Sequence, residues 1–569
     1  MKFVAQKLDP ATLDPITLEI IHNGLRSVTD ETFVALMQSA YSTNIKERHD
    51  HSTAIIDPRG RLVVQAERAM PTHLGSVVDM MSVVLRKYGV EHCHQGDIFV
   101  GNDPYVAGGT HLPDVNIAMP VFVGGKLLAF ICTIAHHADI GGMAPGSMAG
   151  GMTEIFQEGL RIPVVKLFRR GKLMQDIFDL LLLNVRVPEE RRGDYFAQIA
   201  ACRLGERRLI ELAETYSTAV LEEAFDEIIA RTGQRMRDAI SKIPDGVYEF
   251  ADVMDGDGLG TLDIPIKTRI EVKGDHITLD FSESGDQVRG NINAGFNATQ
   301  SSACYVLKAM LDPEVPNNQG VQDAITIICG KGKIVNAAFP AAIAARNHTC
   351  QRVVDVIIGA LAKALPQNAV AAANGSNTTI VFSGVDPRNR SPYVYFETLG
   401  GGFGGRYSKD GKDGVQVHIT NTSNLPVESI EMEYPLLVES YGFVVDSGGA
   451  GRNRGGLGLR RVIRPIDHVC EFNGVGERFR HRPWGLFGGK PGGTGRFVMV
   501  DDDGTEHLLD TKPQTQPLRP DQRLIAETPG AGGYGPPSER TAEKLVEDAR
   551  SGKFSAAYLE ANYSYTRTK

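Results

Sequence analysis

The sequence predicts a multidomain α+β protein in which mixed and antiparallel sheets carry flanking helices. Its 569 residues exceed the roughly 250–300 residues at which a single hydrophobic core stops growing. Helical periodicity and strand-like alternation occupy separate blocks of the chain, which is typical of α+β proteins. The 62 glycines gather in the second half without a fixed period, and this indicates many tight turns in a β-rich region.

The first 90 residues predict a helix, a hairpin and a second helix. Asp14 and Pro15 form a helix start, because a capping side chain precedes a proline at the first helical position. Apolar residues then recur at helical spacing, so we expect a helix over 15–42. Two β-rich runs flank the turn at 57–60 and predict a hairpin. The stretch 74–89 reads as a helix that ends at Gly89.

The stretch 115–135 predicts a second hairpin with Gly124-Gly125 at its tip. Pro120 lies in its first strand and indicates an edge position or a bulge. Beyond it, helical patterns fill 176–241, and strands begin near 248 with a hairpin around Gly274-Asp275. Further elements are expected in four ranges: helices at 297–311 and 349–365, strands and turns at 366–535, and a helical tail at 538–560. The expected units are 1–245 (metal-binding and catalytic), 246–365 (α/β), 366–537 (glycine-rich and β-dominated) and 538–569 (helical tail).

Composition and charge narrow the class of protein. Apolar residues make up 42% and charged residues 23% of the chain, as in ordinary globular proteins. The net charge of -9 argues against a protein that coats nucleic acid or an anionic membrane. Apolar runs fall short of the roughly 18 residues that span a bilayer, and the first residues lack the core of a secretory signal. Seven scattered cysteines without a Cys-x-x-Cys pair suit a reducing compartment, so we expect a cytoplasmic protein without nucleic-acid or membrane partners.

A His-x-x-Asp pattern occurs twice, in "GGTHLPDVN" and in "AHHADIGG". If the second hairpin turns at 124–125, paired positions sum to 249 or 250, and Asp114 lies opposite His136 at the open end. Opposed residues place their Cβ atoms about 4.5–5.5 Å apart. His111 and Asp139 lie in the loops just beyond. Two imidazoles and two carboxylates suit zinc, or manganese or iron with added waters, although a lone His-x-x-Asp is more often a hydrogen-bonded loop pair.

The first hairpin extends the same argument. Pairing around 58–59 puts Asp50 near Glu67 at its open end, within "KERHDHS". Asp50 is the best carboxylate in that stretch to complete a metal site. Two other glycine-rich or acidic stretches do not carry such an argument. "GGGFGG" lacks the Lys-Ser/Thr pair of a phosphate-binding loop, and "DGDGLG" lacks the closing glutamate of a calcium loop.

Several long motifs resemble the hydantoinase B/oxoprolinase family. They are "NDPYVAGGTHLPDV", "AHHADIGGMAPGSM", "EIFQEGLRIPVVKLF", "LDPEVPNNQG", "ARNHTCQRVVDVIIGAL", "RPWGLFGGKPG" and "ETPGAGGYGPP". The resemblance covers nearly the whole chain and implies four metal ligands, which are Asp50, His111, Asp114 and His136. It gives Asp139 a role in supporting His136 or in catalysis. His137 is expected to contact substrate or shuttle protons, with a packed structural histidine as the alternative.

Other polar residues near these motifs are weaker candidates. His73 precedes a helix and either lines the pocket or caps that helix. Glu154 follows the metal loops and is a candidate catalytic carboxylate. Arg161 and Arg346 are candidates for substrate binding, because an arginine can hold a carboxylate or phosphoryl group with two hydrogen bonds. A structural ion pair is the alternative for each of them.

The resemblance implies a reaction shared between two subunits. An ATPase partner of the hydantoinase A type phosphorylates a cyclic amide such as a hydantoin, 5-oxoproline or a lactam. This chain then supplies a metal-activated water that attacks the activated carbon, while His137 or Asp139 moves protons. The expected assembly is a hetero-oligomer built on A–B pairs that uses a divalent metal and ATP. Two alternatives remain open: an α-type subunit of an ATP-dependent ketone carboxylase, and a non-catalytic scaffold that docks the ATPase.

Overall fold

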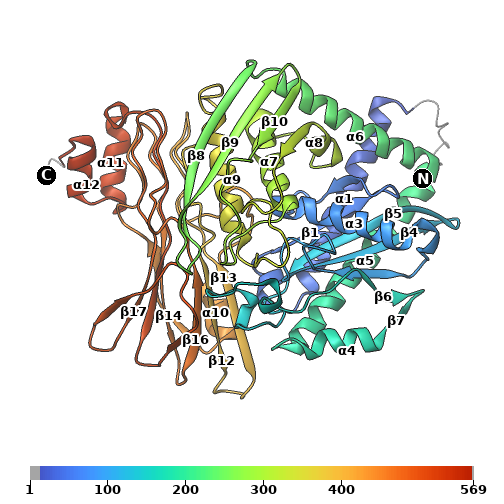
Figure 1. Ribbon diagram of the computed structural model, residues 1–569, viewed down its shortest axis with the longest axis horizontal. Helices are drawn as coiled ribbons and strands as arrows, with labels where there is room; N and C mark the ends of the chain where they lie inside the picture. The colour runs from blue at the N-terminus through green and yellow to red at the C-terminus, as the bar shows by residue number, and fades with distance from the viewer. Residues whose placement is uncertain (1–12, 567–569) are drawn as a thin grey trace, which may run out of the picture.

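The computed structural model describes residues 13–566 of the chain and confirms a multidomain α+β fold with four main sheets and flanking helices (Figure 1). The N-terminal half, coloured blue to green, lies at one end of the long axis. The C-terminal sheets, coloured orange to red, lie at the other end. In the described part of the chain, no helix combines the length and the apolar character needed to cross a membrane.

The N-terminal sheet has seven strands. In spatial order they are β2 (Leu62–Gln65), β1 (His51–Ile56), β5 (Lys126–His136), β4 (Asp114–Val123), β3 (Ile98–Gly101), β6 (Val165–Arg169) and β7 (Lys172–Leu173). Helices α1 (Pro15–Ser39) and α5 (Pro188–Tyr216) pack on one face through Val115 and Ile117. Helix α3 (Leu74–Tyr88) packs on the other face through Ala118 and Phe130. Because both faces are covered, the central strands are apolar throughout.

The β4–β5 hairpin has the register that the sequence predicts. Asp114 pairs with His136, and the chain turns at Gly124 and Gly125, whose positive φ angles of 58° and 80° suit the tight turn. Strand β1 pairs with the other edge of β5, His51 opposite Ala135. The mouth of the hairpin and the start of β1 therefore lie at the same end of the sheet. Pro120 lies beyond the part of β4 that pairs with β3, and a register shift follows it.

The first hairpin also forms, but its predicted register is wrong by one to two residues. Ala54 pairs with Gln65 and Ile56 with Leu62, because the turn is longer than expected and closes with Asp57 N donating to Arg61 O. The predicted approach of Glu67 to Asp50 fails for the same reason. Glu67 is exposed and pairs with Arg26 at 3.4 Å.

Helices α4 (Gln175–Leu183), α5 and α6 (Thr218–Ile240) confirm the predicted helical block. The next sheet has the order β11 (Ile325–Ile328), β10 (His276–Asp280), β9 (Leu262–Lys273) and β8 (Gly246–Gly256). Helices α7 (Phe296–Leu311) and α9 (Arg346–Leu361) pack against one another beside it. Helix α9 begins three residues earlier than predicted, which makes Arg346 its first residue. That position brings Arg346 to the metal-binding motifs.

Two sheets make up the C-terminal part. One has the order β13 (Pro392–Thr398), β12 (Thr379–Val385), β16 (Cys470–Val475) and β19 (Gln516–Leu518). The other has the order β14 (Leu436–Phe443), β15 (Leu459–Pro465), β20 (Arg523–Glu527), β17 (Arg496–Val500) and β18 (Glu506–Leu508). The sequence predicts strands and turns alone over 366–535, but this span also contains helix α10 (Val427–Glu433). The tail folds into α11 (Ala542–Ser551) and α12 (Ala556–Tyr563), as predicted.

Four glycine-rich segments, 400–405, 448–456, 485–493 and 530–535, pack backbone against backbone and are called the glycine bundle here. Gly405 N donates to Gly532 O at 2.9 Å, and Gly449 N donates to Ala531 O at 2.8 Å. A Cβ atom on Gly404 would lie 1.8 Å from Ala371 O, and one on Gly456 would lie 1.8 Å from Lys412 O. Close backbone approach therefore requires glycine here. The sequence pattern had indicated turns alone.

Candidate metal centre

Three strand ends meet at one end of the N-terminal sheet. Asp114 is the first residue of β4, His136 is the last residue of β5, and Asp50 directly precedes β1. His136 N donates to Asp50 O at 3.0 Å, which ties the two strand ends together. His111 lies in the turn before β4, where its backbone carbonyl accepts from Asp114 N at 3.2 Å. The hairpin register thus gathers four of the predicted site residues at one buried edge.

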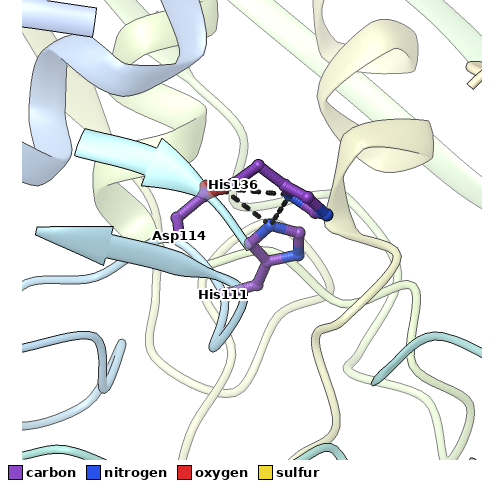
Figure 2. Close-up of side chains that lie close together, drawn as sticks. All are labelled: His111, Asp114 and His136. Carbon is purple, nitrogen blue, oxygen red and sulfur yellow. Dashed lines mark hydrogen bonds and ion pairs between the residues drawn. The ribbon is translucent and has the colours of Figure 1, made fainter. Parts of the chain in front are cut away.

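The side chains of His111, Asp114 and His136 converge on one point (Figure 2). The Nε2 atom of His111 lies 3.0 Å from Asp114 Oδ1, and the Nδ1 atom of His136 lies 3.3 Å from the same oxygen. The two imidazole nitrogens are 3.2 Å apart. All three side chains are buried. Within residues 13–566, this is the group of histidine, cysteine and carboxylate side chains that meets the distance requirement for holding one metal ion.

The hydrogen bonds around His111 prepare it to bind a metal. Its Nδ1–H donates to Ala344 O at 2.7 Å, which leaves the lone pair of Nε2 facing Asp114 and His136. Burial, followed by the positive charge of Arg346, lowers the pKa of His111 to about 4. A neutral imidazole whose second nitrogen is held by a carbonyl is the form that ligates metals.

The spacing of the three atoms fits a divalent cation. For metal–ligand bonds of about 2.0–2.2 Å, adjacent ligands lie about 2.9–3.5 Å apart in octahedral to tetrahedral geometry. The separations of 3.0, 3.2 and 3.3 Å lie within that range. Two nitrogens and one carboxylate oxygen are a donor set that zinc, manganese and iron accept. The residues present therefore fit the metal that the sequence predicts, without selecting among these ions.

Asp114 is held ionised by its neighbours. Burial alone would raise the pKa of its carboxyl group, but His111 and then Arg346 outweigh burial and hold the pKa well below its usual range. Arg346 Nη2 donates to Asp114 Oδ2 at 2.6 Å, and Thr110 Oγ1 donates to the same oxygen at 2.5 Å. One carboxylate oxygen thus faces the imidazoles while the other is fixed from behind.

Asp50 and His73 line the same pocket beside the three-residue group. His73 Nε2 lies 3.7 Å from Asp114 Oδ2 and 4.0 Å from Asp50 Oδ1, so it stands between two carboxylates. Its other nitrogen, Nδ1, is 2.9 Å from Ser52 Oγ. Asp50 stays outside the three-residue group, and its role as a fourth ligand stays a prediction. His73 lines the pocket, as one of its two expected roles required.

Arg346 also lines this pocket. Its Nη2 atom is bonded to Asp114 and Thr110, whereas its buried Nε and Nη1 atoms have no hydrogen-bond partner in the structure. The bond to Asp114 is the structural ion pair that was the alternative for this residue. The unbonded donors leave its expected part in substrate binding a prediction.

His137 lies on the opposite side of the strand end from His136, because successive residues of a strand point to opposite faces. Its Nε2 atom pairs with Gln198 Oε1 at 3.1 Å, and its ring packs on Tyr195 with centroids 4.7 Å apart. Burial lowers its pKa to about 4. His137 does not line the metal pocket. The geometry thus matches the alternative of a packed structural histidine.

Asp139 does not reach His136 among the hydrogen bonds of the described residues. It accepts from Gly141 N at 3.0 Å and from Gly146 N at 3.2 Å, and it pairs with Arg186 at 2.9 Å. Asp139 therefore orders the loop that follows the hairpin. The expected support of His136 by this carboxylate has no contact to carry it.

Glu154 and Arg161 also lie away from the pocket. Glu154 is exposed and caps the 3₁₀ turn Ile155–Gln157. Arg161 pairs with Asp103 and stacks over the rings of Phe156 and Phe339, at 4.9 and 5.0 Å from their centroids. Both residues make local structural contacts, which were the alternative to a role in the site.

The far wall of the pocket comes from residues that sequence reasoning did not select. They are Met70, Thr72, Met148, Asn347, His348, Asn377, Thr379, Phe396, Thr398 and Thr420. His348 is buried, and neither of its ring nitrogens has a partner in the structure. The "ARNHTC" motif contains Asn347 and His348 and offered a signal for them. The residues from β12 and β13 offered none, because only the tertiary fold brings them near β4.

Comparisons with known proteins agree with this architecture. Residues 14–537 match the family model described as hydantoinase B/oxoprolinase. The B-type subunit of a putative D-/L-hydantoinase from Pseudomonas sp. is 32% identical over 98% of this chain and 96% of its own length. The crystal structure of ATP-dependent caprolactamase from Pseudomonas jessenii has a TM-score of 0.92 at 28% identity, covering 98% of this chain and 97% of that one. A nucleotide-free acetone carboxylase structure shares the fold at 18% identity with a TM-score of 0.86, over 97% of this chain and 79% of that one.

Proposed function

Because the chain belongs to the hydantoinase B/oxoprolinase family, we propose that it is the metal-dependent catalytic subunit of an ATP-dependent cyclic amide hydrolase. The single observation that carries this proposal is the buried convergence of His111, Asp114 and His136. The names of its relatives, a hydantoinase of which one is the B-type subunit and an ATP-dependent caprolactamase, supply the reaction class. The substrate class is a ring that contains an amide bond.

His111, Asp114 and His136 would hold the cation, with Asp50 as the nearest further carboxylate in the pocket. A divalent cation held there supplies Lewis acidity, which polarises a carbonyl group and makes water a stronger acid. Zinc is the first choice for this donor set, and manganese or iron are accepted as well. Arg346 balances the charge of Asp114 in a buried setting and so preserves its ionised form.

His73 is better placed than His137 to move a proton in this pocket. Its Nε2 atom faces both Asp50 and Asp114, so a proton at Nε2 has an acceptor on either side. Ser52 Oγ, which accepts from Met70 N at 2.9 Å, holds the opposite ring nitrogen. We assign His73 the role of proton carrier, and we assign His137 to the packing between β5 and α5.

The activation of the amide by ATP is assigned to a partner subunit of the hydantoinase A type. A relative named as the B-type subunit of a hydantoinase supports a hetero-assembly, and the caprolactamase relative is described as ATP-dependent. The segment "GGGFGG" belongs to the glycine bundle, where its amides bond to neighbouring backbone carbonyls. Those amides are therefore committed to the fold.

The proposal is tested by purifying the chain together with its ATPase partner and offering hydantoin, 5-oxoproline and lactams with ATP. We expect one ring to be opened in step with ADP formation. Removal of metal by a chelator should abolish this reaction, and zinc or manganese should restore it. Incorporation of labelled bicarbonate into a ketone would instead identify a carboxylase subunit. Full activity of a metal-free chain would identify a scaffold.

A further inference from the structure

A second, open cavity lies beside the metal pocket. It has a volume of about 310 Å³, whereas the free space in the metal pocket is about 10 Å³, which is room for roughly one water molecule. A cyclic amide therefore fits the second cavity in this conformation but does not fit the metal pocket. The walls come from the turn before α3, from α7 and from the stretch 418–421.

The two cavities meet at Thr420, which lines both. Pro71 and Leu74 line the open cavity, while Thr72 and His73 between them line the metal pocket. One turn of chain thus separates the two spaces. A molecule in the open cavity lies one side chain away from the residues that face Asp114.

The polar atoms that face the open cavity are mainly hydrogen-bond donors. Lys308 of α7 is half-buried, and its ammonium group makes no ion pair or hydrogen bond with the other described residues. His418 is 7% exposed, and its Nε2 atom has no hydrogen-bond partner in the structure. Its Nδ1 atom is 3.5 Å from the Tyr305 hydroxyl group. Burial lowers the pKa of Lys308, so an anionic ligand would restore the charged form of the amine.

His418 also holds an uncommon backbone conformation, with a φ angle of 52°. A residue other than glycine adopts this conformation at an energetic cost, and such strain gathers where a side chain must be aimed at a ligand. The remaining walls are apolar and come from Ala69, Pro71, Leu74, Cys304 and Pro313. Apolar walls with a few convergent donors are typical of small-molecule sites.

From this geometry we propose that the open cavity binds the substrate as a ring amide that carries an anionic group. The ring packs on the apolar wall, and Lys308 neutralises a carboxylate or phosphoryl group on it. The inference rests on the proposed function for the nature of the ring, whereas the choice of an anion follows from Lys308 and His418 alone. Thr420 marks the point from which the amide carbon passes to the metal pocket.

The test measures binding to the full chain by calorimetry in the presence of a chelator, so that a bound metal contributes nothing. The probes are 5-oxoproline, which carries a carboxylate, 2-pyrrolidinone, which is the same ring without it, and inorganic phosphate. The variant Lys308→Met is compared with Lys273→Met, which removes an exposed lysine on β9. Circular dichroism establishes that both variants fold.

We expect Lys308→Met to weaken binding of 5-oxoproline or phosphate by at least about tenfold, the value of one charge-assisted contact. It should change binding of 2-pyrrolidinone by less than about twofold, and Lys273→Met should change neither. A loss confined to 5-oxoproline identifies a ring carboxylate, and a loss confined to phosphate identifies the phosphoryl group. Equal affinities of wild type and Lys308→Met for both anions overturn the proposal.

A second variant keeps the proposal falsifiable if Lys308→Met does not fold. Ala309 is exposed at the edge of the cavity, and Ala309→Trp should fill the opening and weaken all ring ligands together. Unchanged binding of 5-oxoproline to that variant also overturns the proposal. Because these measurements need neither ATP nor turnover, intact binding without hydrolysis would count against the proposed function alone.

Discussion

Two buried clusters of charged side chains differ in how completely their polar atoms are bonded. The site cluster contains His111, Asp114, His136 and Arg346. The tail cluster joins the 410–413 stretch to the C-terminal helices and contains Asp410, Asp413, Arg454, Arg540 and Asp548. In the tail cluster, none of the buried nitrogens and oxygens lacks a partner. In the site cluster, His136 Nε2 and two nitrogens of Arg346 have none.

The tail cluster is a closed network. Arg454 pairs with Asp413 at 2.8 Å, and Arg540 pairs with Asp410 at 2.9 Å and with Asp548 at 2.7 Å. Buried polar groups are normally satisfied, so unbonded atoms in a pocket indicate a ligand. The comparison teaches that the degree of bonding, rather than burial or charge, separates a site from a structural joint in this molecule.

The largest expected effect breaks the site cluster. Asp114→Asn should leave the purified chain with less than about a tenth of its metal and lower turnover by about a thousandfold, because the carboxylate oxygen shared by both imidazoles becomes a weaker donor. Metal analysis and ADP release measure this. Glu154→Gln is the matched control for an exposed carboxylate outside the pocket, and we expect turnover within about twofold of wild type. A metal-replete, active Asp114→Asn protein would contradict the assignment.

The tail cluster should respond in stability rather than in turnover. Arg540→Met leaves Asp410 and Asp548 with fewer partners in a buried setting, which should lower the free energy of unfolding by about 3 kcal/mol. Denaturant titration followed by fluorescence measures the change. Activity per folded molecule should equal that of wild type. A loss of turnover without a loss of stability would place this cluster in the chemistry.

Glu158 sharpens the comparison, because it is fully buried and has one bonded and one unbonded oxygen. Its Oε1 atom accepts from Ile343 N at 2.6 Å and from Ala344 N at 2.7 Å, while Oε2 has no partner. Burial raises its pKa from 4.5 to about 8. Between those values the folded chain keeps a proton that the unfolded chain releases, so stability falls as pH rises from 4.5 to 8.

Glu158→Gln removes this titration. Relative to the variant, wild type should therefore lose at least about 1 kcal/mol of stability between pH 5 and pH 8. Denaturant midpoints at several pH values measure the difference. Parallel profiles for the two proteins would show that Glu158 is ionised in the fold throughout.

The smallest expected effect concerns His137. His137→Asn removes the hydrogen bond to Gln198 and should lower the free energy of unfolding by about 1–2 kcal/mol, with kcat within about threefold of wild type. The pair of variants His73→Asn and His137→Asn compares the proton carrier with the packed histidine in one assay. A greater loss of kcat for His137→Asn than for His73→Asn would reverse the two roles.

The core of the site could be predicted from the sequence because it is local. A two-glycine turn fixes the register of a hairpin, so the positions of Gly124 and Gly125 sufficed to place Asp114 opposite His136. Asp50 joined this group through pairing of β1 with β5, although the expected register of its own hairpin was wrong. The turn there contained more residues than the Asp-Pro-Arg-Gly pattern implied.

The opposite wall could not be predicted, because it is built by contacts between distant segments. Phe396, Thr398 and Thr420 lie more than 250 residues from Asp114 in the chain, and no periodicity links them to it. Asp139 and His137 were misleading for a local reason, since the strand ends at His136 and the next side chains leave in other directions. Short helix α10 lacked a long periodic pattern, so its block was assigned to strands and turns.

The glycine bundle has a consequence for how variation in this protein should be interpreted. At Gly404 and Gly456 the neighbour is a carbonyl oxygen 1.8 Å from an added Cβ, and no rotamer change can relieve that clash. A saturation library should therefore be depleted at these positions as strongly as at His111. A sequence profile alone would mistake this architectural demand for chemistry.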